Sequence, residues 1–308
     1  MLFKEIINEK SNLLQPEFDK LFNNIINSQT HQGDLLLVNI NGFYNPEVNE
    51  WSHLPKKLSP YVIGPHKEGH SNNLHYKFIN NYRQNAIYYL THEDYLKEHI
   101  YTIDKKEKID KLLDSEYLSI QLEMLIYLKV WESDLFIKKL YQLTRLALGE
   151  SYDWHFLISN GRDNSKATGT REKILRILTR DRLENKYPQI YKALKEAYQT
   201  QIRNSIAHSN YSFQNRFLNL NNYIENDPAA QLKGISFDKW IYLFHDTMVI
   251  YNQIIRFFNK VDFYYADLAL KNNSQIEVRI NRKDPEVKTE YRLLQYRTEW
   301  KDWSWKDK

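Results

Sequence analysis

The sequence predicts a mainly α-helical fold with short β-strands near its two ends. Only 8 Gly and 8 Pro occur among 308 residues, which favours long regular elements. Apolar side chains recur at intervals of three and four over several long stretches, as on one face of a helix. Hydrophobic residues make up 42% of the chain, which is typical of a globular protein rather than a disordered one.

Composition excludes several classes of protein. The chain contains no Cys, so disulfides, thiolate catalysis and thiolate metal sites are ruled out together, and a cytoplasmic location is expected. The N-terminal segment MLFKEIINEK has no long apolar run after a basic start, so we expect no signal peptide. No stretch approaches the roughly 20 apolar residues of a membrane-spanning helix. We therefore expect no membrane partner.

Segment 1–104 reads as an α+β region. Two short helices are expected in 1–29, the second beginning after Pro16. The run 34–40, DLLLVNI, reads as a strand, with a turn at Asn41 and Gly42 and a possible return strand at Phe43–Tyr44. Residues 45–75 look irregular, and 76–100 return to a helical pattern.

Three histidines in the irregular segment raise the possibility of a zinc site. His66, His70 and His75 are spaced by four and five residues, and imidazoles can ligate zinc. A polar loop is the better interpretation, because Gly69 and consecutive polar residues interrupt the segment. We therefore expect no metal and no cofactor.

Helical patterns dominate the middle of the chain. One long helix is expected at 115–148, with leucines on its apolar surface and Gly149 as its stop. Residues 151–170 form a polar loop whose order of Gly, Lys and Thr is not that of a phosphate-binding P-loop. The leucines that contribute to the helix surface are Leu118, Leu122, Leu125, Leu128, Leu135 and Leu143.

Two further helices carry most of the positive charge. Residues 170–216 contain ten Arg or Lys against four Asp or Glu, although the net charge of the chain is only +4. In the expected helix at 171–185, Lys173, Arg176 and Arg180 gather on one side. They are candidates for contacts with a phosphate backbone, or they form an ordinary solvated face.

The stretch from Pro188 to Tyr211 reads as one amphipathic helix, at 188–208, that ends in a polar cluster. Pro188 suits a first helical position, and Asn204 and His208 are four apart and so share a face. Arg203 lies five residues before His208, but its long side chain can swing toward the imidazole. A permanent cation and a side chain that exchanges protons near neutral pH would then meet.

The remainder of the chain is expected to hold one more long helix and a β-hairpin. Residues 212–235 read as a loop with a short extended piece at 217–220, and Ser236 or Asp238 can cap a helix to about Lys271. His245 is expected to be a packed core histidine. In the tail, alternating residues 276–280 and the segment 287–296 predict paired strands. Trp300, Trp303 and Trp305 follow, and we expect them to be buried rather than to stack on bases.

At the motif, the chain resembles a known family. The run Ile202-Arg203-Asn204-Ser205-Ile206-Ala207-His208 is similar to the R-x4-6-H motif of the HEPN (higher eukaryotes and prokaryotes nucleotide-binding) superfamily. The polar residue after the arginine, the IAH ending and the nearby Tyr211 also match the common pattern. The resemblance covers about 110–271 and implies an HEPN-like helical bundle at 105–271, between the N-terminal α+β region at 1–104 and the hairpin and Trp-rich tail at 272–308.

The resemblance implies an RNA endonuclease that needs no metal. In catalytic members two protomers face each other, so a homodimer with a composite active site is expected. Arg203 is expected to hold the scissile phosphate, His208 to act as general acid or base, and Asn204 to orient the imidazole or bind phosphate. Tyr211 and the basic residues of 171–185 are expected to contact RNA. Toxin or phage-defence systems, with an antitoxin or regulatory partner, are a further expectation.

Two alternatives stay open from the sequence. Arg203 can be paired structurally with a carboxylate while His208 caps helix carbonyls, in which case the chain is a non-catalytic RNA-binding or protein-interaction module. The histidines of the irregular segment can instead hold a metal in a hydrolytic enzyme.

Overall fold

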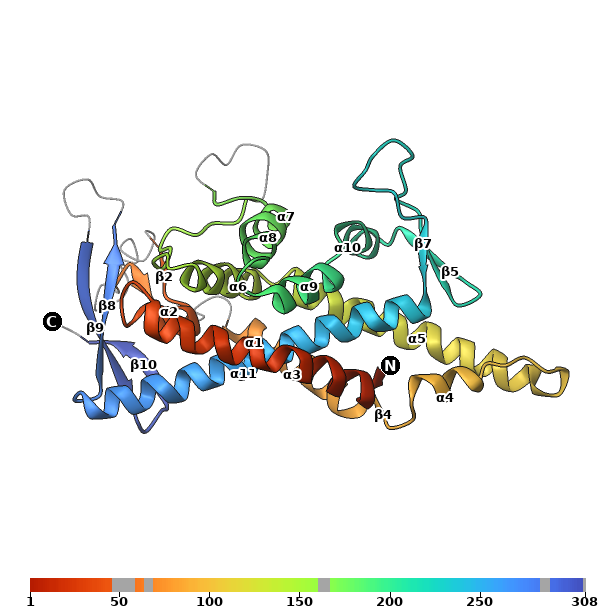
Figure 1. Ribbon diagram of the computed structural model, residues 1–308, viewed down its shortest axis with the longest axis horizontal. Helices are drawn as coiled ribbons and strands as arrows, with labels where there is room; N and C mark the ends of the chain where they lie inside the picture. Colours follow the sequence, from red (N-terminus) through yellow and green to blue (C-terminus); the bar gives the residue numbers. More distant parts are fainter. Residues whose placement is uncertain (46–58, 64–68, 160–166, 283–288, 307–308) are drawn as a thin grey trace. The chain divides into compact units, whose positions relative to one another are not determined.

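Most of the chain is helical in the computed structural model, which describes residues 1–45, 59–63, 69–159, 167–282 and 289–306. The described helices and strands are labelled in Figure 1. Within the described residues, no helix is long and apolar enough to cross a membrane.

Contacts divide the chain into two compact units, each built from three separate segments. Unit 1 comprises Met1–Pro16, Leu74–Ser133 and Pro188–Gln253, and unit 2 comprises Glu17–Asn73, Asp134–Tyr187 and Ile254–Lys308. Two long helices, α1 (Lys4–Ser28) and α11 (Phe237–Lys271), contribute residues to both units. The boundaries expected near 104 and 272 divide the sequence, whereas the compact units each combine distant segments.

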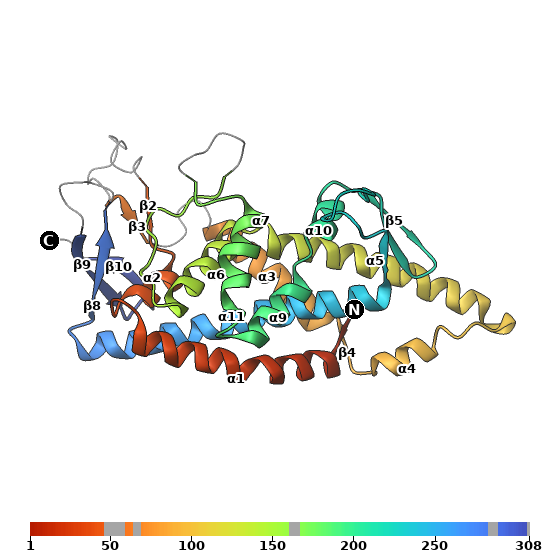
Figure 2. The same ribbon diagram turned by 45° about the horizontal axis from the view of Figure 1, so that its top comes forward.

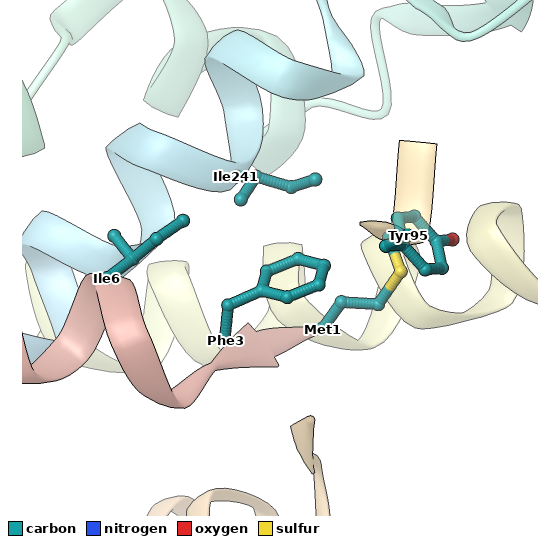
Figure 3. Packing of buried hydrophobic residues seen from close by; sticks show 5 residues of the cluster. All are labelled: Met1, Phe3, Ile6, Tyr95 and Ile241. Atoms are coloured by element: carbon teal, nitrogen blue, oxygen red, sulfur yellow. The ribbon is translucent and has the colours of Figure 1, made fainter. Parts of the chain in front are cut away.

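The elements of unit 1 surround a buried patch at the start of the chain. Strand β1 (Leu2–Phe3) pairs in parallel with β4 (Ile87–Tyr88). Figure 3 shows Met1, Phe3 and Ile6 packed with Tyr95 of α4 (His92–Lys97) and Ile241 of α11, and all five side chains are buried. Segments far apart in the sequence therefore share one core.

A buried carboxylate joins three helices of unit 1. Glu123 lies on α5 (Lys106–Trp131), which follows the 3-10 turn η2 (Ile103–Lys105). It accepts hydrogen bonds from the hydroxyl of Tyr82 on α3 (Gly69–Asn85; 2.8 Å) and the indole of Trp240 on α11 (2.7 Å). The backbone nitrogen of Met1 also contacts this carboxylate. These bonds satisfy a charge that would otherwise be costly to bury.

Unit 2 packs helices beside small sheets. It holds α2 (Asp34–Ile40), α6 (Asp134–Ala147) and a helical segment made of α7 (Arg171–Lys173), the π-helix η3 (Ile174–Arg180) and α8 (Asp181–Leu183). Strands β2 (Phe43–Tyr44) and β3 (Tyr61–Val62) pair antiparallel. The rings of Phe22 on α1 and Phe257 on α11 pack edge to face with their centroids 5.8 Å apart, an arrangement that aromatic pairs favour.

The expected C-terminal hairpin is confirmed and gains a third strand. Strands β8 (Gln275–Asn281), β9 (Thr289–Arg297) and β10 (Asp302–Trp305) form one antiparallel sheet in the order β10-β9-β8. The alternating residues Ile276, Val278 and Ile280 are buried as predicted. Of the three tryptophans expected to be buried, Trp303 is buried and Trp305 is partly buried, whereas the prediction is wrong for Trp300, which is 71% exposed.

Several expected elements are corrected. The strand expected at 34–40 is helix α2, because its consecutive apolar residues are all buried and such a run fits a short helix as well as a strand. Asn41 closes this helix in the left-handed region (φ 54) rather than turning a hairpin. Instead of the two helices expected in 1–29, one helix, α1, runs from Lys4 to Ser28 and continues through Pro16, with Leu14 and Phe18 buried on either side of the proline.

The helix expected at 115–148 is two helices. α5 ends at Trp131 and α6 begins at Asp134, in the next compact unit. The predicted stop at Gly149 is confirmed: it adopts φ +80, and the N–H of Glu150 donates to the carbonyl of Arg145 (2.9 Å). This bond closes the end of α6 in the way that a left-handed glycine permits.

The expected irregular segment 45–75 and the helix after it are also revised. α3 begins at Gly69, so His70 and His75 lie on a helix, while His66 lies outside the described residues. The expected helical region 76–100 is confirmed in part, since β4 separates α3 from α4.

Candidate nucleic-acid site at the end of α10

The motif occupies a short helix that is separate from the one before it. Instead of one helix at 188–208, the chain forms α9 (Pro188–Ala197) and α10 (Thr200–Ala207). Gln199 is extended (φ -115, ψ 109), and its N–H donates to the hydroxyl of Tyr127 on α5 (3.2 Å). The ring of Tyr198 packs on Trp131 at 5.4 Å. These contacts with α5 hold the chain out of helical geometry at the break.

Arg203 is paired with a carboxylate at the end of α5. Its Nη1 lies 2.9 Å from Oε1 of Glu132, and the two side chains are 17% and 34% exposed. The Nε atom of Arg203 is buried and makes no hydrogen bond to any described residue. The guanidinium is thus held in place but keeps a donor without a partner.

His208 lies just past the last turn of α10 with its side chain exposed. Its backbone N–H donates to the carbonyl of Asn204 (3.1 Å), so the two residues are one helical turn apart. The imidazole makes no hydrogen bond or ion pair with any residue that the structure describes. The helix carbonyl is capped by the backbone rather than the side chain, and the imidazole is open to a ligand.

The chain after the motif turns back in a fixed way. Ser209 adopts a left-handed conformation (φ 52). The N–H of Asn210 donates to the carbonyl of Ser205 (2.7 Å), and the hydroxyl of Ser205 donates to the carbonyl of Asn210. Ser205 is fully buried. This double contact directs the chain into the next strand, which begins at Tyr211.

Tyr211 opens a small sheet, in which the extended piece expected at 217–220 is confirmed as a strand while strands also form in the parts of 212–235 expected to be loop. Strands β5 (Tyr211–Gln214), β6 (Phe217–Leu220) and β7 (Gly234–Ser236) are antiparallel. They lie beside the first turns of α11 (Figure 2), and Phe213 stacks on Tyr117 of α5 at 5.3 Å. The predicted cap of α11 is confirmed by the bond from Lys239 N–H to the hydroxyl of Ser236 (3.2 Å).

An arginine at the hairpin tip anchors this sheet. Asn215 and Arg216 both have positive φ (48 and 56), as a two-residue hairpin turn requires. Arg216 donates two hydrogen bonds to the buried carboxylate of Glu116 (2.9 and 3.0 Å) and one to Asp238 (3.1 Å). Sequence reasoning missed Glu132, Glu116 and this arginine, because only the packing of unit 1 brings them to the motif and its hairpin.

The basic residues expected to bind RNA belong to the other unit. Lys173, Arg176 and Arg180 lie on α7 and η3 in unit 2, whereas Arg203 and His208 lie in unit 1. Arg176 pairs with Glu172 and Arg180 with Asp181, both at 2.6 Å, while Lys173 is exposed. Two of the three cations are therefore partly neutralised within their own helical segment.

Two further predictions concern histidines and acids outside the motif. Among the described residues no group of three His, Asp or Glu side chains is placed to hold a metal ion. His245 is fully buried, as predicted: its Nε2 accepts from the N–H of Phe3 (2.8 Å), and its Nδ1–H donates to the carbonyl of Ile241 (2.7 Å). Burial lowers the pKa of His245 to about 3.

Comparisons with protein-family models, curated proteins and solved structures gave no match to this chain.

Proposed function

We propose that the chain is an HEPN-type endoribonuclease that cleaves RNA without a metal through the residues at the end of α10. The exposed imidazole of His208, one turn from Asn204 and without a competing partner among the described residues, carries this proposal. An imidazole that is not engaged by the protein can accept or donate a proton at the substrate.

The chemistry needs no group that the motif lacks. RNA carries its own nucleophile, the 2′-OH next to the scissile phosphate. His208 removes that proton as general base or protonates the departing 5′ oxygen as general acid. The products are a 2′,3′-cyclic phosphate and a 5′-OH, and DNA resists cleavage because it has no 2′-OH.

Arg203 has the chemistry to stabilise the phosphate. Its guanidinium is a permanent cation whose N–H groups donate hydrogen bonds to anionic oxygens, and the Nε–H without a partner is buried, so RNA must displace its surroundings to reach that donor. Its pairing with Glu132 places a negative charge beside the guanidinium, so a phosphate must share or displace that carboxylate. We assign Arg203 to transition-state stabilisation and Asn204 to orienting His208 or the phosphate.

The second candidate is a non-catalytic RNA-binding or protein-interaction module with an HEPN-like bundle. The Arg203–Glu132 ion pair favours it, because a guanidinium that is held by a carboxylate can serve the packing of α10 on α5 alone. An antitoxin or regulatory partner, and a cytoplasmic location, fit either candidate.

The test is cleavage of mixed single-stranded RNA, with EDTA present, by the wild type and by His208→Ala and Arg203→Ala. The nuclease proposal expects cyclic-phosphate ends from the wild type and a loss of at least about a hundredfold in rate in each variant. His208→Ala should unfold like the wild type, since the side chain it removes is exposed.

RNA bound but not cut by all three proteins would favour the binding module. Equal cutting by all three would place the activity elsewhere and contradict the proposal. His155→Ala is a matched control, because it removes a histidine in unit 2 rather than at the motif.

A further inference from the structure

Three leucines of α5 form an exposed apolar stripe in unit 1. Leu118 is 70% exposed, Leu122 40% and Leu125 46%. Their spacing of four and three residues places them on one face of the helix. The opposite face packs into unit 1 through Ile120, Tyr127 and Val130, which are buried. The stripe is therefore an apolar surface without a partner among the described residues.

Charged residues extend the same face at both ends of the stripe. At about 100° per residue, the stripe and four flanking charged positions fall within an arc of about 80°. Asp114 and Lys111 precede the leucines, and Lys129 and Glu132 follow them. The order along this face is Lys111, Asp114, Leu118, Leu122, Leu125, Lys129, Glu132.

This face is complementary to the same face of a second copy of the helix that runs in the opposite direction. A point between Gln121 and Leu122 is the midpoint of three pairs: Leu118 with Leu125, Asp114 with Lys129, and Lys111 with Glu132. A two-fold axis at that point sets each residue of a pair against the other in a second copy of the helix. Leucine then faces leucine, and each acid faces a base.

We propose that α5 pairs antiparallel with α5 of a second copy of this chain, about a two-fold axis next to Leu122. The three leucines form the centre of the contact and the two kinds of charge pair flank it. A single two-fold contact makes every charge pair twice, so a modest energy per pair is doubled.

Three of the four flanking charges lie at or near the surface, whereas Glu132 is already paired with Arg203. Asp114 is exposed and has no ion-pair partner in the described chain. Lys129 lies over the ring of Phe78 at 5.6 Å, which leaves its ammonium near the helix surface. Lys111 pairs with Glu107, its one ion-pair partner among the described residues, and both side chains are more than three-quarters exposed. An exposed pair of this kind contributes little and exchanges readily.

The contact borders the candidate site of each copy. Glu132, which ends the charged face, is the carboxylate that holds Arg203. Lys111 of the second copy would share that carboxylate. Dimer formation does not depend on RNA cleavage, because it can be measured from the mass of the protein without RNA. A monomeric wild type would therefore leave the nuclease proposal untouched.

The test is the mass of the purified protein in solution across a range of concentrations. The wild type should be a dimer, and Leu122→Asp a monomer with an unchanged far-UV circular dichroism spectrum. Asp114→Lys and Lys129→Asp should each raise the dimer Kd by about tenfold, because each sets like charges together twice. The double variant D114K/K129D should recover the wild-type Kd.

Cysteine cross-linking tests the register, and the absence of native Cys gives a clean background. Leu122→Cys should form a disulfide with itself. Leu118→Cys alone should not, because its two copies are offset by about 10 Å along the helices, whereas a mixture of Leu118→Cys and Leu125→Cys should cross-link. A wild type that is monomeric at all concentrations, or a double variant that does not recover, overturns the proposal.

Discussion

At the scale of single residues, burial separates the two histidines His208 and His245. His208 is exposed at the end of α10. His245 is enclosed on α11 with both ring nitrogens bonded to backbone groups. One nitrogen of His245 accepts and the other donates, so the ring must be neutral to keep both bonds. The exposed imidazole is left free for a substrate, and the buried one holds β1 against α11.

The neutral His245 predicts a pH dependence of stability. Its pKa is lowered to about 3 by burial, so the unfolded chain binds a proton below about 6.5 that the folded chain does not. The free energy of unfolding should therefore fall as the pH drops below about 6.5, by up to about 1.4 kcal/mol per pH unit. His245→Gln should be less stable at neutral pH but should have a flatter profile between pH 6.5 and 4.

Urea unfolding of both proteins across that pH range checks this prediction. Other buried acids titrate in the same interval, so the difference between the two profiles is the quantity to compare. Parallel profiles would mean that His245 is not held neutral.

At the scale of elements, the β5–β6 hairpin is held by an ion pair between a half-buried arginine and a buried carboxylate. Glu116 is almost completely buried, and Arg216 from the hairpin tip forms two hydrogen bonds to it. Removing one partner of such a pair leaves an uncompensated charge in the interior. The hairpin that follows the motif is therefore fixed to α5 by this contact.

Arg216→Ala should lower the free energy of unfolding by about 3–5 kcal/mol. Adding Glu116→Gln should recover part of that loss, because the neutral amide costs less to bury. Arg182→Ala is the matched control: its partner Glu150 is 35% exposed, so the loss should be about 1 kcal/mol or less. Equal losses in denaturant melts of Arg216→Ala and Arg182→Ala would contradict the assignment.

The helix breaks show where periodicity misleads. The patterns at 115–148 and 188–208 each continue across a break, since a two-residue interruption hardly disturbs a spacing of three and four. The break at Gln199 is set by the hydroxyl of Tyr127, which is 72 residues away in sequence. No local signal in the sequence encodes such a contact.

At the scale of the whole molecule, each compact unit is assembled from segments distant in sequence. The predicted bundle at 105–271 contains only part of unit 1 and lacks Met1–Pro16 and the start of Leu74–Ser133. The missing segments supply Phe3, Ile6 and Tyr95, which pack with Ile241 (Figure 3). The unit therefore depends on chain outside the predicted boundaries.

A fragment of residues 105–271 should not unfold cooperatively. Each large apolar side chain lost contributes about 1.5–3 kcal/mol, so the three together approach the total stability of an ordinary domain. Circular dichroism during thermal and urea unfolding, with the full chain as control, checks this. A cooperative transition matching that of the full chain would support the boundaries near 104 and 272.

The sequence by itself determined the helical class, the long final helix, the C-terminal hairpin and the burial of His245, because period, capping residues and composition act over short distances. It also singled out Arg203, Asn204 and His208, whose shared chemistry remains a prediction. Only the tertiary structure decided that Arg203 meets Glu132, that Arg216 secures the next hairpin, and that three leucines of α5 face outward. Those outcomes depend on which distant segments pack together, and a one-dimensional pattern records which residues can be buried but not what they are buried against.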